Sequence, residues 1–96
     1  MITADREEAL ERQVRQLSAD GNFSDAFSLL DCEIESAPTA GLYFLRGRLR
    51  WKTGNKSGAI SDYCAATELE PDSPAAEALE MCRRVMDFYH HDLYNP

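Results

Sequence analysis

Aromatic and basic side chains share one predicted helical stripe near the middle of the chain. They are spaced i, i+4, i+7 and i+8 and comprise Phe44, Arg48, Trp51 and Lys52. Aromatic and arginine side chains together have the composition of interface hot spots. The stripe therefore favours recognition of another chain, although the aromatic rings fit equally well as core residues and the cations as a solvated face.

Residues suited to catalysis or metal binding form no recognisable constellation. His90 and His91 are adjacent, and neighbours on a helix point to different faces, so together with Asp92 they fit a metal site poorly. The sequence has no glycine-rich phosphate loop, no CxxC pair and no Ser–His–Asp or Cys–His arrangement. We expect no enzyme, no metal and no cofactor.

Charge and cysteine usage limit the class of partner. The net charge is −7, which argues against binding to nucleic acid or to an anionic membrane and favours a positively charged partner. Cys32, Cys64 and Cys82 are odd in number and far apart, and no signal peptide or membrane span is readable. We therefore predict a cytoplasmic protein whose cysteines are reduced and buried as small hydrophobes, the alternative being a reactive thiol or a ligand.

The chain repeats itself at one constant offset, without a gap. Gly-Asn, Ser, Ala and Pro coincide, and the matched positions include Gly21 with Gly54, Ser24 with Ser57, Ala26 with Ala59, Leu30 with Tyr63, and Pro38 with Pro71. Each glycine suits a helix end with positive φ, and each serine is predicted to cap the next helix. The alanine allows two helices to cross closely, the Leu or Tyr lies on the same face, and proline ends the unit. Each unit therefore predicts a helix, a tight turn and a second helix.

These repeats resemble the tetratricopeptide family. The second unit carries the pattern at Tyr43, Gly47, Gly54, Ala59, Tyr63, Ala66 and Pro71, and the first at Leu10, Leu17, Gly21, Ala26, Leu30 and Pro38. Val14 stands where the family usually has Gly, and Arg46 and Arg50 replace the usual Leu and Tyr. Ankyrin repeats have a similar period, but their Thr-Pro-Leu-His signature is absent.

The resemblance implies a single all-α domain over residues 1–96. Antiparallel helix–turn–helix units at about 5–38 and 39–72 would stack in a right-handed superhelix, followed by a capping helix at about 73–90 and an aromatic tail at 91–96. The expected helices cover residues 3–19, 24–36, 39–53 and 56–69, and a fifth begins at Ser73-Pro74, with the serine as its cap. That fifth helix should cover the exposed side of the fourth.

The resemblance also implies a peptide-binding concave face lined by the first helix of each pair. The corresponding residues are Glu8, Glu11, Arg15, Ser18, Phe44, Arg48, Trp51, Lys52, Glu77, Met81 and Arg84. Arg15 and Arg48 are separated by the same offset as the matched glycines, so the two arginines are expected at equivalent sites. Some family members hold a carboxy-terminal carboxylate with Lys and Asn, but here Glu11, Arg15 and Leu45 stand at those places, which disfavours a chaperone-tail adaptor.

The carboxyl end is unusually aromatic, because Phe88, Tyr89 and Tyr94 lie close together there. These rings either pack on the fourth helix, or the tail folds back over the protein's own groove or enters the groove of a neighbouring molecule. We therefore expect a protein-interaction module that binds a peptide or partner protein on its concave face. The alternative is a self-associating scaffold, a homodimer through the capping helix and the aromatic tail.

Overall fold

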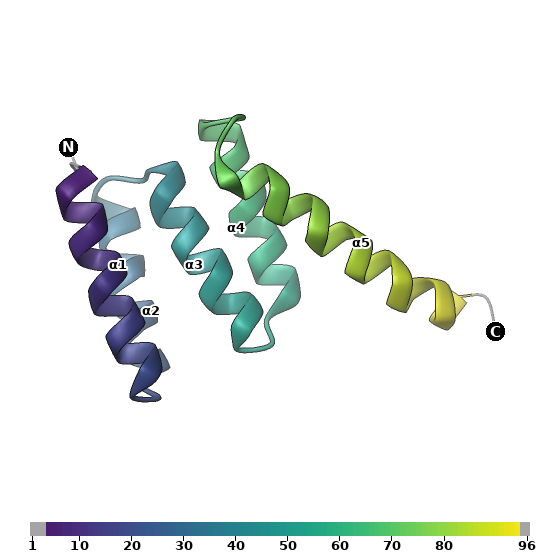
Figure 1. Cartoon of the computed structure of the whole chain (residues 1–96), viewed down its shortest axis with the longest axis horizontal. Coiled ribbons are helices and arrows are strands. Elements are labelled where there is room, and N and C mark those ends of the chain that lie inside the picture. Colours follow the sequence, from purple (N-terminus) through teal and green to yellow (C-terminus); the bar gives the residue numbers. More distant parts are fainter. Residues whose placement is uncertain (1–3, 95–96) are drawn as a thin grey trace.

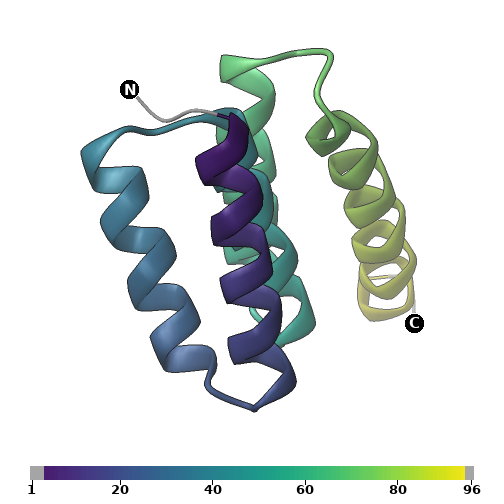
Figure 2. The ribbon, with the colours of Figure 1, turned by 60° about the vertical axis from the view of Figure 1, so that its left-hand side comes forward.

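The computed structural model describes the backbone of residues 4–94 and the side chains of residues 5–87. Its elements are α1 (Ala4–Ala19), α2 (Phe23–Ser36), α3 (Ala40–Lys52), α4 (Lys56–Leu69) and α5 (Pro74–Tyr94), and the described residues contain no strand. The predicted all-α class is confirmed. Figure 1 shows α1, α3 and α5 in one layer with α2 and α4 behind them, and Figure 2 shows α2 and α5 on opposite sides of α1.

The first four helices begin and end within one residue of the predicted bounds, but α5 is longer than predicted. It continues to Tyr94, so the boundary placed near residue 90, between a capping helix and a separate tail at 91–96, is wrong. The side chains of residues 88–94, including His90, His91 and Asp92, lie outside the described residues, as do residues 95–96. Both interpretations of the aromatic tail therefore stay predictions.

The two turns inside the helical hairpins share one hydrogen-bonding pattern. Gly21 and Gly54 have φ angles of 80° and 96°, as their sequence context predicts. The N–H of Asn22 donates to the Leu17 carbonyl and that of Asn55 to the Arg50 carbonyl, each at 2.8 Å. These bonds close the end of each first helix and satisfy carbonyls that would otherwise have no partner.

The predicted serine caps are wrong. Helices α2 and α4 begin directly after the asparagines, so Ser24 and Ser57 already lie inside the helices. The side chain of Asn55 caps α4 by accepting from the Gly58 N–H at 3.0 Å. Helix α5 does begin at Pro74 as expected, but the buried hydroxyl of Ser73 has no hydrogen-bond partner and caps nothing.

Two clusters of buried residues meet at α3. The first joins α1, α2 and α3 through Leu10, Val14, Ala26, Leu30, Ile34, Leu42 and Leu49. The second joins α3, α4 and α5 through Ala40, Ala59, Tyr63, Ala66, Ala75, Leu79 and Cys82. Tyr43 packs against both clusters. Helix α5 therefore covers α4, as the sequence predicts, and α3 is the element that both halves share.

Helices α3 and α4 approach each other closely at Gly47. A Cβ atom built on Gly47 would lie 2.7 Å from Cε1 of Tyr63 and 3.3 Å from the carbonyl oxygen of Ala59. Ala59 is itself fully buried, so small residues face each other across this contact. In the first hairpin, Val14 stands at the position equivalent to Gly47. Helices α1 and α2 contact each other less extensively than α3 and α4 do.

A buried carboxylate on α4 pairs with Arg46 and Arg50 of α3. Asp62 of α4 is 2% exposed and accepts two hydrogen bonds from Arg46, at 2.8 and 3.0 Å, and one from Arg50 at 3.1 Å. Arg46 also reaches Asp31 of α2 at 2.8 Å, so one guanidinium links three helices. The hydrogen bonds that Arg46 donates to Asp62 raise the pKa of Arg46 above its ordinary value, because the carboxylate stabilises the charged form.

The cysteines do not share one environment. Cys82 is fully buried and Cys64 half-buried, but Cys32 is exposed, so the prediction that all three are buried is wrong for Cys32. Burial raises the pKa of the Cys82 thiol. Within the described range of the chain, no helix combines the length and the apolar character needed to cross a bilayer.

The Gly47→Ala substitution tests the close approach of α3 and α4. Alanine favours a helix over glycine by about 1 kcal/mol. We nevertheless expect the free energy of unfolding to fall by about 1–3 kcal/mol, because the new methyl group meets the Tyr63 ring. Urea denaturation followed by circular dichroism measures the change.

Gly41→Ala, in the first turn of the same helix, is the matched control. There the added Cβ would meet the carboxylate of Glu7, the far end of a flexible side chain that can rotate away. We expect a change below about 1 kcal/mol. Equal effects at the two glycines would contradict the proposed tight contact.

Asp62→Asn tests the buried ion cluster. We expect the free energy of unfolding to fall by about 3 kcal/mol, because two partly buried guanidinium groups lose the charge that compensates them. Replacing Arg46, Arg50 and Asp62 together by Leu should restore most of that loss, since no uncompensated charge remains. Thermal and urea unfolding of both variants measures this, and a triple variant less stable than Asp62→Asn would contradict the account.

Candidate functional site

A groove runs between α1 and α3 on the face away from α2 and α4. It consists of two adjoining recesses of about 240 Å³ each, which share Glu11, Leu45 and Arg48. We call it the α1–α3 groove. Its lining comprises Glu7, Glu8, Glu11, Val14, Arg15, Ser18 and Ala19 of α1, and Gly41, Phe44, Leu45, Arg48, Leu49 and Lys52 of α3.

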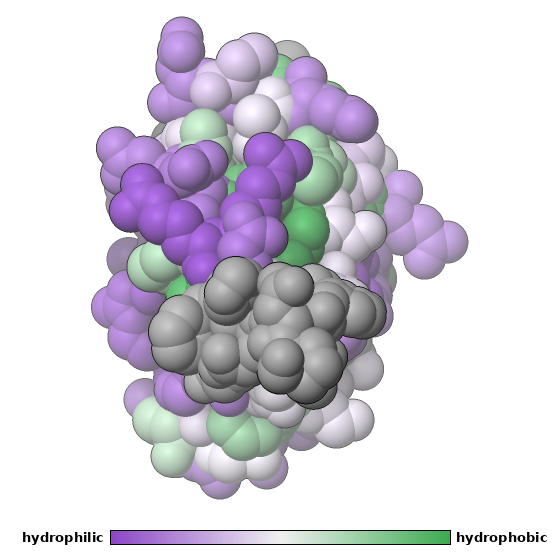
Figure 3. Space-filling model, turned by 90° about the vertical axis from the view of Figure 1, so that its right-hand side faces the viewer, coloured by the Kyte–Doolittle hydropathy of each residue, from purple (hydrophilic) through white to green (hydrophobic). Residues whose placement is uncertain are grey.

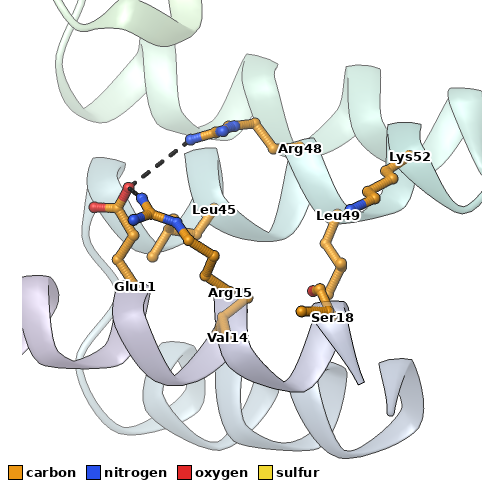
Figure 4. Close-up of a pocket in the computed structure, with 9 residues that line it drawn as sticks. Glu11, Val14, Arg15, Ser18, Leu45, Arg48, Leu49 and Lys52 are labelled. Carbon is orange, nitrogen blue, oxygen red and sulfur yellow. Dashed lines mark hydrogen bonds and ion pairs between the residues drawn. The ribbon is translucent and has the colours of Figure 1, made fainter. Parts of the chain in front are cut away.

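Helical spacing brings these side chains together. Each of the two helices contributes four residues at i, i+3, i+4 and i+7, namely Glu11, Val14, Arg15 and Ser18 from α1, and Leu45, Arg48, Leu49 and Lys52 from α3. Val14 and Leu49 are buried and Leu45 is half-buried, so they form an apolar floor. The charged residues stand above that floor as a rim (Figure 4).

Opposite charges meet across the rim. One carboxylate oxygen of Glu11 lies 3.0 Å from Nη2 of Arg15 and 3.9 Å from Nη1 of Arg48 (Figure 4). The guanidinium carbon of Arg48 also lies 5.7 Å from the centroid of the Phe44 ring, within the range of a cation–π contact. Among the side chains that the structure describes, Lys52 has no ion-pair partner.

The two ends of the groove differ in charge. Glu7 and Glu8 line the end near the amino termini of α1 and α3, where the Glu7 carboxylate accepts a hydrogen bond from the Thr39 hydroxyl. Arg15, Arg48 and Lys52 line the other end. Glu7 lies in the first turn of α1, near the positive end of that helix dipole, and Lys52 lies in the last turn of α3, near the negative end of its dipole. Both charges are therefore favourably placed. The groove therefore presents an acidic end, an apolar floor and a basic end.

Most of the predicted peptide-binding residues line this groove, namely Glu8, Glu11, Arg15, Ser18, Phe44, Arg48 and Lys52. Trp51 does not line it. The Trp51 ring packs against the second buried cluster, with Nζ of Lys56 4.1 Å from its centroid. Its role as a binding residue therefore has no support from the groove.

The three predicted residues of α5, Glu77, Met81 and Arg84, lie outside both recesses. Met81 is 54% exposed, and Nε of Arg84 lies 3.8 Å from a carboxylate oxygen of Glu80 in the preceding turn. Figure 3 shows the side of the molecule toward which α5 extends, where a narrow apolar strip lies next to hydrophilic side chains.

Sequence reasoning missed the floor of the groove. Val14, Leu45 and Leu49 resemble ordinary core positions, because an apolar residue at helical spacing is compatible with either role. The sequence does offer one indication, because each of these apolar residues has an arginine directly before or after it in the chain. Only the separation of α1 from α3 leaves part of this apolar surface open.

The chemistry of the groove lining is that of charged and apolar side chains. Among the described side chains, no group of three or more His, Cys, Asp or Glu residues could hold a metal ion. The lining carries carboxylates, guanidinium groups and one ammonium group, but neither of its recesses includes a cysteine or histidine. An apolar floor with a polar rim is the usual composition of a site that receives another chain.

No protein-family model and no curated protein matches this sequence. A solved structure does. The chain is similar to Bacteroides fragilis protein BF1650, determined by solution NMR, with 31% identity over 88% of each chain and a TM-score of 0.76. At that identity and coverage the chain belongs to the same family as BF1650, and the helical fold is shared.

Proposed function

We propose that this protein is a small interaction module that binds an extended peptide segment of a partner protein in the α1–α3 groove. The observation that carries the proposal is the groove itself, whose apolar floor lies between two charged rims contributed by the first helix of each hairpin. Peptide grooves combine apolar pockets that provide affinity with a polar rim that sets register and orientation.

We further propose that the two hairpins are tetratricopeptide-type repeats of one domain, stacked in a right-handed superhelix and closed by α5. The shared turn hydrogen bonds support this, because Leu17 and Asn22 correspond to Arg50 and Asn55 at the repeat offset. The buried positions of Ala26 and Ala59 also support it. In such a stack the first helices of successive units line one face, where the groove lies.

A peptide selected from a displayed random decapeptide library tests this function. Titrated into the ¹⁵N-labelled chain, it should shift the amide resonances of α1 and α3 around Glu11, Arg15, Leu45 and Arg48. Shifts confined to α2, α4 or α5 would place binding elsewhere and contradict the proposal.

Leu45→Ser should raise the Kd for that peptide about tenfold, because it removes apolar surface from the groove floor. Leu69→Ser is the matched control, since Leu69 is 52% exposed and lies outside the groove. Fluorescence anisotropy measures both affinities. Circular dichroism melts establish that each variant is folded at the temperature of the measurement.

A further inference from the structure

The charge of the α1–α3 groove differs from the charge of the whole chain. The protein carries a net charge of −7, yet the part of its groove near the carboxyl ends of α1 and α3 is lined by three cations and one carboxylate. We propose that the groove selects acidic segments, with a carboxylate of the partner bound between Arg15 and Arg48 and with Lys52 adding to the positive charge of the same recess. This inference rests on the proposed peptide-binding function and names the chemistry of the peptide.

The position of Glu11 supports the inference. One of its carboxylate oxygens, Oε1, lies between two arginines. It is 3.0 Å from Nη2 of Arg15 and 3.9 Å from Nη1 of Arg48, the latter at the limit of an ion pair. A carboxylate already occupies the place that the peptide's carboxylate would take. Glu11 therefore acts as an internal competitor that holds the two guanidinium groups toward the groove until a ligand arrives.

The arginines retain unused hydrogen-bonding capacity. Their side chains are 70% and 56% exposed, and each guanidinium has five N–H donors, of which Glu11 engages few. Phe44 lies beside the Arg48 guanidinium, which limits its freedom to turn away from the groove. Lys52 adds a third positive charge without an ion-pair partner among the described residues.

The same geometry sets the direction of the ligand. Glu7 and Glu8 line the opposite end of the groove and would repel a second carboxylate there. Val14, Leu45 and Leu49 lie beside the cations and would receive an apolar side chain. The preferred segment therefore has an acidic residue adjacent to an apolar one, with the acidic residue toward the carboxyl ends of α1 and α3.

The composition of decapeptides selected on the wild-type chain is the first readout. We expect enrichment of Asp or Glu next to Leu, Ile or Phe. For one enriched peptide, replacing the acidic residue by its amide should weaken binding about fivefold, and raising the NaCl concentration should weaken the acidic peptide more than the amide.

Substitutions in the groove provide the second readout. Arg15→Ala and Arg48→Ala should each weaken the acidic peptide about fivefold, whereas Glu11→Gln should strengthen it several-fold by removing the competitor. Arg12→Ala is the control for the two arginine variants, and Glu35→Gln is the control for Glu11→Gln. Each control makes the same change in net charge as the variants it is matched to, at an exposed position outside the groove. Neither control should alter affinity by more than about twofold.

The outcomes separate the two proposals. Enriched peptides that are neutral or basic, yet shift the amides of α1 and α3, would overturn the acidic preference and leave the peptide-binding function standing. A weaker rather than stronger affinity for Glu11→Gln would also overturn it. Peptides that shift no resonance of the groove at millimolar concentration would overturn the peptide-binding function itself.

Discussion

The contact between α3 and α4 at Gly47 constrains the rest of the molecule. Because no Cβ is present, the Tyr63 ring and the Ala59 carbonyl lie where a side chain would otherwise stand. Helix α3 is thereby held against α4 on one side, and Leu42 and Leu49 pack into the first buried cluster on another. With two faces buried, the surface of α3 that carries Arg48 and Lys52 is left for the groove.

The arginines of α3 show how one helix serves both purposes. Arg46 and Arg50 are four residues apart, share a face and pair with the buried Asp62. Arg48 lies between them in sequence, about 200° around the helix from each, and reaches Glu11 of α1 instead. The inner pair compensates the buried charge of Asp62, and breaking such a pair on one side leaves an uncompensated charge. The outer arginine keeps its donors accessible to a ligand.

Much of the fold was predictable because its signals are local. Gly21 and Gly54 mark helix ends since few other residues adopt positive φ, and Pro74 marks the start of α5. The serine caps failed because asparagine already occupied the position just before each helix, and two residues with similar capping preference cannot be ranked from sequence. Within the candidate site, the repeat pattern predicted that Arg15, Arg48 and Lys52 lie on the binding face. It did not predict that Trp51 packs against the second buried cluster instead.

The sequence by itself determined the helices, their approximate bounds, the internal repeat and the small residues at the crossing of α3 and α4. These are properties of spacing and of individual side chains, which act within a few residues along the chain. Only the tertiary structure decided that Asp62 is the partner of Arg46 and Arg50. It also decided that Glu11 lies between Arg15 and Arg48, and that Val14, Leu45 and Leu49 form the floor of a groove. These relations depend on the distance and rotation between helices, which arise from packing across the whole core.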